Sequence, residues 1–104
     1  MSTQLDEMNQ RIERIKQELL KLGPMRPGFI SRQYRKPKEK ERPFYQISYT
    51  HQMRSHTEYV RPENLEALRR EVATFKRFRK LIDQWVDLAL RTSQLRVRKD
   101  KLSM

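Results

Sequence analysis

The chain contains no cysteine, only two glycines and two histidines, and no long run of apolar residues. The lack of cysteine excludes disulfide bridges and thiolate metal sites, which fits a reducing compartment. No apolar run approaches the roughly 18–20 residues that span a bilayer. The polar start, from Met1 to Glu7, is unlike the apolar core of a secretory signal. We therefore expect a cytoplasmic protein with no membrane segment.

Recognisable catalytic patterns are also missing. The sequence has no phosphate-binding glycine loop, no dinucleotide fingerprint and no nucleophile elbow. His51 and His56 are the only histidines, and no carboxylate pair stands near them at ligand spacing. Asp83 and Asp87 lie one helical turn apart without a histidine nearby, which is typical of a solvated helix face. We expect a protein that is not an enzyme, with no catalytic residues, no metal and no cofactor.

What the chain has in excess is positive charge. It carries 24 lysines and arginines against 13 acidic residues, a net charge of +11. The first 22 residues are balanced, with four of each sign, so the excess lies between residues 23 and 104. Nucleic acid is the commonest partner of so basic a protein. The plainer reading is a basic protein whose charge serves only solubility.

The spacing of apolar residues predicts an α+β fold with an N-terminal helix, a three-stranded antiparallel sheet and a long C-terminal helix. Residues 3–22 have helical periodicity, ended by Gly23 in a left-handed cap and by Pro24. Alternation predicts strands at 29–36, 43–50 and 54–60, with 51–53 as the second loop. A helix starts at Pro62, and Thr92 and Ser93 are a point where it can break. We predict three parts: a helix at 1–23, a sheet-plus-helix domain at 24–90 and a basic tail at 91–104.

Two apolar stripes predict helix packing. The N-terminal stripe has the three- and four-residue spacing of a coiled-coil seam. Its partner is either a helix of the same chain or one of a second copy, and the sequence leaves both open. The C-terminal stripe is longer than a small sheet can cover, which favours a homodimer or a larger complex. The residues expected at this oligomer or partner interface are Leu5, Met8, Ile12, Ile15, Leu19, Leu22, Ile82, Trp85 and Val86.

The predicted sheet has two unlike faces, because successive side chains of a strand alternate. One face is predicted to hold Ile30, Tyr34, Tyr45, Ile47, Tyr49, Thr57 and Tyr59. The other is predicted to hold Ser31, Gln33, Arg35, Gln46, Ser48, Arg54 and His56. We expect a helix to cover the first face and a polyanion to meet the second. The candidate nucleic-acid-binding residues are Arg32, Gln33, Arg35, Lys36, Lys38, Lys40, Arg42, Gln46, Arg54 and His56.

Four short segments stand out: Ser31–Pro37, Pro43–Tyr49, Thr57–Val60 and Phe75–Leu81. With these segments the chain resembles, over most of residues 5–90, a family of short bacterial and archaeal proteins of unknown function that are often found near mobile elements. Members of that family carry a cysteine-rich segment after the R-Y-R-K motif, which suggests a metal site. This chain has Pro37–Arg42 there without cysteine, so the resemblance implies no metal here. Because the family is uncharacterised, it also implies no function.

The sequence favours a non-enzymatic nucleic-acid-binding protein that contacts duplex DNA with the polar face of its sheet. The second interpretation is a protein–protein adaptor or inhibitor whose basic surface binds an acidic protein. The third is an RNA-binding subunit of a ribonucleoprotein, which differs from the first only in its ligand. A steep salt dependence of binding separates the nucleic-acid interpretations from the adaptor.

Overall fold

The computed structural model describes residues 3–35, 38 and 42–103, with the side chains of 99–103 left aside. The elements are α1 (Gln4–Leu20), β1 (Phe29–Gln33), β2 (Phe44–His51), β3 (Arg54–Val60) and α2 (Leu65–Ser103). A 3₁₀ turn at Pro62–Asn64 leads into α2. This order confirms the predicted α+β fold. Contacts divide the chain into two compact units: residues up to Leu22 together with those from Arg77 onward, and Gly23–Lys76. The helix α2 contributes to both units and continues past residues 90 and 92 to Ser103 without a break.

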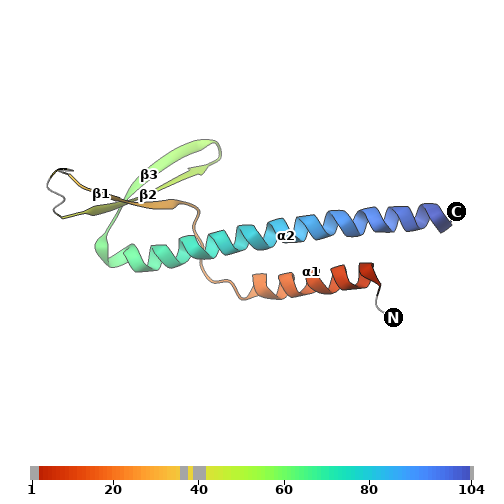
Figure 1. The fold of residues 1–104 in the computed structure, drawn as a ribbon. Coiled ribbons are helices and arrows are strands. Elements are labelled where there is room, and N and C mark those ends of the chain that lie inside the picture. The colour runs from red at the N-terminus through yellow and green to blue at the C-terminus, as the bar shows by residue number, and fades with distance from the viewer. Residues whose placement is uncertain (1–2, 36–37, 39–41, 104) are drawn as a thin grey trace. The chain divides into compact units, whose positions relative to one another are not determined.

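The first unit is a pair of helices. Thr3 caps α1, because its hydroxyl accepts a hydrogen bond from the backbone N–H of Asp6 and the Asp6 carboxylate accepts one from the N–H of Thr3. The helix ends at Leu20, with the cap at Lys21 in a right-handed conformation, so the predicted left-handed cap at Gly23 is wrong. In Figure 1, α1 runs antiparallel to the C-terminal part of α2. An ion pair of 2.6 Å between Glu18 and Arg77 joins the two helices.

The predicted seam of α1 forms the core of this unit. Its residues Met8, Ile12 and Ile15 are buried against Leu81 and Leu88 of α2. The partly buried residues around this core are Leu19, Leu22, Trp85 and Leu95. The α1 seam therefore packs within the chain, which was one of the two alternatives left open. The predicted interface residue Val86 lies outside this core and is 60% exposed.

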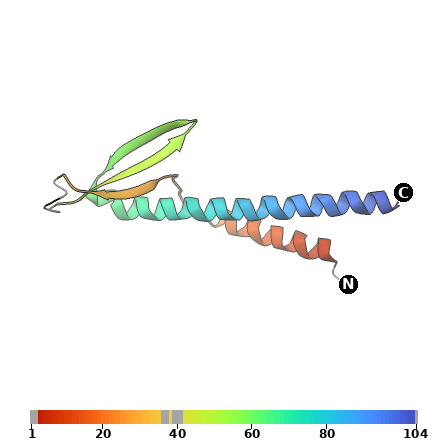
Figure 2. The ribbon, with the colours of Figure 1, turned by 45° about the horizontal axis from the view of Figure 1, so that its top comes forward.

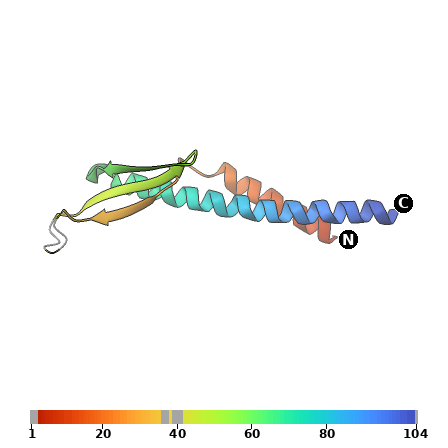
Figure 3. The same ribbon diagram turned by 90° about the horizontal axis from the view of Figure 1, so that it is seen from above.

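The second unit is an antiparallel sheet on the first turns of α2. Its strand order is β1-β2-β3, so β2 is central and the other two are edge strands, as Figure 3 shows from above. The core consists of Ile47, Val60 and Val72, with Ile30, Tyr45, Leu65 and Leu68 packed around it. Gly28 precedes β1 with a φ of 147°, and a Cβ there would lie 2.8 Å from Ile47 Cγ1. This conformation favours glycine, and the absence of a side chain lets the connector between α1 and β1 approach the core closely.

The β2–β3 hairpin is longer than β1, which pairs only with Phe44–Ser48 (Figure 2). Its loop has two residues, Gln52 and Met53, with φ angles of 52° and 65°. Two positive φ angles in a two-residue loop are the geometry of a type I′ turn, which normally prefers Asn-Gly. The loop therefore contains two residues, whereas the sequence predicted three.

Candidate nucleic-acid interface

The observed register gives the sheet an inner face toward α2 and an outer face away from it. Ile47 pairs with Ile30 of β1 and Glu58 of β3, so these residues share the inner face. The outer face comprises Phe29, Ser31, Gln33, Phe44, Gln46, Ser48, Thr50, Ser55, Thr57 and Tyr59. Within the three strands, the charged residues are Arg32, Arg54 and Glu58, and all three lie on the inner face. The outer face is consequently polar but uncharged.

This arrangement corrects the predicted faces of β3. Arg54 and His56 were expected beside Gln46 and Ser48, but they lie on the inner face with Glu58 and Val60. Thr57 and Tyr59, expected to turn inward, are exposed on the outer face. Arg32 also lies on the inner face, since it pairs with Tyr45. Of the predicted binding residues in the strands, only Gln33 and Gln46 belong to the outer face.

A cationic groove lies between β1 and α2, along the β1 edge of the sheet. It has a volume of about 350 Å³ and is lined by Phe29, Ile30, Arg32, Tyr45, Arg69, Val72, Ala73 and Lys76. The guanidinium groups of Arg32 and Arg69 lie 5.9 and 5.7 Å from the centre of the Tyr45 ring, within cation–π range. Among described residues, the lining holds three cations and no carboxylate.

Arg32 and Arg69 make only exposed contacts within the chain. Arg32 donates a hydrogen bond of 3.5 Å to the Tyr34 hydroxyl, and this contact raises the pKa of Arg32. Arg69 pairs with Glu66 at 3.2 Å one turn earlier on α2. That pair is exposed, and an exposed pair of this kind is worth only about 0.3–0.5 kcal/mol. A phosphate group can therefore displace it at small cost.

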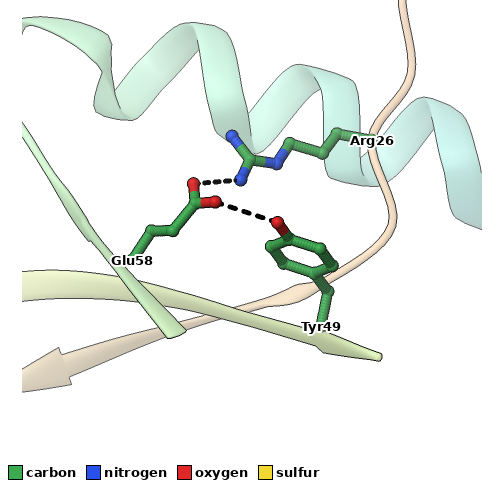
Figure 4. A network of polar contacts seen from close by, with 3 residues as sticks. All are labelled: Arg26, Tyr49 and Glu58. Carbon is green, nitrogen blue, oxygen red and sulfur yellow. Dashed lines mark hydrogen bonds and ion pairs between the residues drawn. The ribbon is translucent and has the colours of Figure 1, made fainter. Parts of the chain in front are cut away.

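A cluster of polar side chains on the inner face of the β2–β3 hairpin neutralises the charge of Glu58. The Glu58 carboxylate forms an ion pair with Arg26 and accepts a hydrogen bond of 2.9 Å from the Tyr49 hydroxyl, as Figure 4 shows. The hydrogen bond from Arg26 lowers the pKa of Glu58, and that from Tyr49 lowers it further. The Tyr49 ring also stacks on His56, with centroids 5.0 Å apart. This network explains how β3 can turn a carboxylate toward the helix side of the sheet.

The remaining predicted cations belong to the β1–β2 loop. Arg35, Lys38 and Arg42 are exposed there, and Arg42 has a φ of 51°. The predicted binding residues Lys36 and Lys40 lie outside the described residues. The loop joins Gln33 to Phe44, which are paired in the sheet, so the described cations Arg35, Lys38 and Arg42 follow the end of the sheet where Arg32 pairs with Tyr45.

A second cationic hollow lies within the helical unit. It is lined by Arg11, Arg14, Arg77 and Arg91 together with Glu18 and Asp87. Two of these arginines are paired, Arg77 with Glu18 and Arg91 with Asp87. The two carboxylates make this hollow a weaker anion site than the groove of the sheet unit.

Sequence reasoning missed three residues of the groove: Tyr45, Arg69 and Lys76. The tyrosine was assigned to the face under the helix, and Arg69 and Lys76 were not among the predicted binding residues. Helical spacing held a partial signal. Val72 and Ala73 stand three and four residues after Arg69, and Lys76 stands four and three residues after them, which places all four along one side of α2.

Comparisons of the chain with family models, with curated proteins and with solved structures found no match. The resemblance to a family found near mobile elements therefore stays a prediction. Among the described residues, no group of three or more metal-ligating side chains is close enough to hold an ion. No helix in the described part of the chain is long and apolar enough to cross a membrane.

Proposed function

We propose that this protein binds nucleic acid without catalysing a reaction, through the sheet unit. The observation that carries this proposal is the groove of Arg32, Arg69 and Lys76, whose described lining has no carboxylate. Phosphate groups are bound by arginine and lysine on flexible stems, and arginine can engage a phosphate with two parallel hydrogen bonds. The groove follows the edge strand β1, so a phosphate backbone can run along it.

The proposed mode differs from the one expected from the sequence. Cations do not project from the exposed face of the sheet. They lie along its β1 edge and at its loop end, where Arg35, Lys38 and Arg42 extend the positive surface. Duplex DNA remains the favoured ligand, because its two phosphate backbones flank a groove into which strands fit.

The decisive experiment compares Arg69→Ala with Arg70→Ala in a salt series. Both variants remove one arginine from the same turn of α2, but only Arg69 lines the groove. The dependence of log K on log salt should become less steep by about 0.9 for Arg69→Ala on duplex DNA. Arg70→Ala should keep the wild-type slope. Equal slopes in the two variants would contradict the groove as the binding surface.

Ligand class is tested with the wild-type chain. Duplex DNA, single-stranded DNA and RNA are titrated at equal length, and polyglutamate at matched charge serves as an acidic-protein probe. The proposal predicts that polyglutamate competes poorly, since a flexible carboxylate chain lacks the fixed spacing of phosphates. Equal competition would instead support the adaptor interpretation and overturn the proposal.

A further inference from the structure

The outer face of the sheet is a second feature of this unit that the groove does not explain. On a chain of net charge +11, the ten residues of this face carry no charge. Its polar side chains pair with one another: Ser48 with Thr57 at 3.2 Å, and Gln33 with Ser31 at 3.2 Å. Tyr59 and Phe29 remain 60% and 67% exposed. A face of amides, hydroxyls and aromatic rings contacts neutral polar groups better than phosphates.

We propose that this face lies against the base edges of a DNA major groove and favours A·T-rich duplexes. The inference rests on the proposed nucleic-acid binding and names its preferred ligand. Glutamine can form two hydrogen bonds with adenine, while phenylalanine and the threonine methyl group contact the methyl group of thymine. Gln33, Gln46, Phe44 and Thr57 supply these groups. Arginine and lysine side chains recognise guanine, and carboxylates recognise cytosine. The charged residues of the strands, Arg32, Arg54 and Glu58, all lie on the inner face instead.

The spacing of the strands is comparable with the width of the groove. Neighbouring strands are about 4.8 Å apart, so the axes of the edge strands β1 and β3 are separated by roughly 10 Å. The major groove is about 12 Å wide. Arg32 and Arg54 lie on the two edge strands. Their long stems can reach around the edges to the phosphates on either side, while the uncharged face meets the floor of the groove.

The arrangement also separates two roles that one surface rarely combines. Contacts with phosphates position a protein on DNA, and contacts with base edges select the sequence. Here the positioning groups are Arg54 and the cations of the groove at the β1 edge, Arg32, Arg69 and Lys76, and the selecting groups are the side chains of the outer face. Loss of a positioning group should weaken binding to all duplexes equally. Loss of a selecting group should reduce the preference between duplexes.

The test measures the affinity of wild type for A·T-rich and G·C-rich duplexes of equal length. One good bidentate contact distinguishes bases by roughly 5- to 150-fold, so a preference of at least about fivefold for the A·T duplex is expected. Replacing thymine by uracil removes only the methyl group, and replacing adenine by 7-deazaadenine removes the N7 acceptor. Both substitutions should reduce the preference. They change the DNA alone, so no effect on protein folding intervenes.

Two protein variants complete the design. Gln46→Ala should lower the A·T preference at least about threefold, whereas Arg32→Ala should weaken both duplexes by the same factor. Circular dichroism checks that each variant is folded, and Gln33→Ala replaces Gln46→Ala if the latter fails to fold. Tight binding with no A·T preference and no uracil effect would overturn this inference but leave the proposed function intact. Absence of any nucleic-acid binding at low salt would overturn both.

Discussion

The two-residue turn of the β2–β3 hairpin stores strain that a single substitution should release. Met53 has a φ of 65° and is 99% exposed. A left-handed conformation costs an L-residue about 1–2 kcal/mol, a cost that glycine does not carry. The greater freedom of glycine in the unfolded chain offsets about 0.5–1 kcal/mol of that gain. Met53→Gly should therefore raise the free energy of unfolding by about 0.5–1 kcal/mol.

The assay is urea unfolding, followed by signals that distinguish the two units. The four tyrosines, Tyr34, Tyr45, Tyr49 and Tyr59, belong to the sheet unit, and Trp85 belongs to the helical unit. Met53→Gly should shift the tyrosine near-ultraviolet transition to higher urea at an unchanged m-value. The transition monitored by tryptophan fluorescence serves as an internal reference for the other unit.

Met53→Ala is the matched control for this experiment. It removes the exposed side chain but keeps an L-residue at the same φ angle, so its stability should stay within about 0.5 kcal/mol of wild type. If Met53→Gly is no more stable than Met53→Ala, the turn is not strained, and the two-residue loop on which the register depends is wrong.

Three further predictions, each checked by urea unfolding, concern the packing of the two units and the ion pair of Glu58. Leu81→Ala should lower the free energy of unfolding by about 2–5 kcal/mol, because Leu81 is 1% exposed in the helical core. Val86→Ala, at a position that is 60% exposed, should stay within about 0.5 kcal/mol of wild type. Equal effects of the two substitutions would contradict the packing of the seam. Gly28→Ala should destabilise the sheet unit by more than about 1 kcal/mol. Gly23→Ala should not, because the space around its Cβ position is open. A Gly28→Ala variant as stable as wild type would contradict the close approach of Gly28 to Ile47. The pKa of Glu58 is lowered in the folded chain, so its stabilisation is fully present above its ordinary pKa near 4.5 and is lost as the pH falls through the lowered value. Glu58→Gln should remove this part of the acid-induced loss of stability, and an unchanged pH profile would contradict the ion pair.

Most of the fold could be predicted from the sequence because its elements have clear periodic patterns. The helical spacing of Met8, Ile12 and Ile15 and the alternation in 44–50 identify the elements that the structure contains. Their pairing was harder to predict. The α1 seam packs against Leu81 and Leu88 of the same chain. No pattern within α1 shows whether its partner helix belongs to the same chain or to a second copy.

The sequence did not predict which side chains of β3 face α2, because the loop before β3 is one residue shorter than expected. A three-residue loop at 51–53 would pair Tyr45 with Tyr59 and turn tyrosine inward. The two-residue loop pairs Tyr45 with Val60 instead and exchanges the faces of the whole strand. Gln52 and Met53 are poor residues for a type I′ turn, so the sequence favoured the longer loop.

A second cause concerns the charge on β3. From the sequence of β3 alone, a carboxylate such as that of Glu58 is not expected on the side of the sheet that faces α2. This placement becomes favourable because Arg26, in the connector before β1, neutralises the carboxylate, and Tyr49 donates a hydrogen bond to it. Such a partner is 32 residues away in the sequence, and strand alternation carries no information about it.

The central claim is that nucleic acid binds to the sheet unit along β1 and over the outer face. The most direct test is a titration of the ¹⁵N-labelled chain with an A·T-rich duplex, followed by amide chemical shifts. We predict that the largest changes occur in β1, at Gln46 and Thr57, and at Arg69 and Lys76, while α1 changes little. Changes confined to α1 and to α2 beyond Arg77, or none at all at low salt, would contradict the claim.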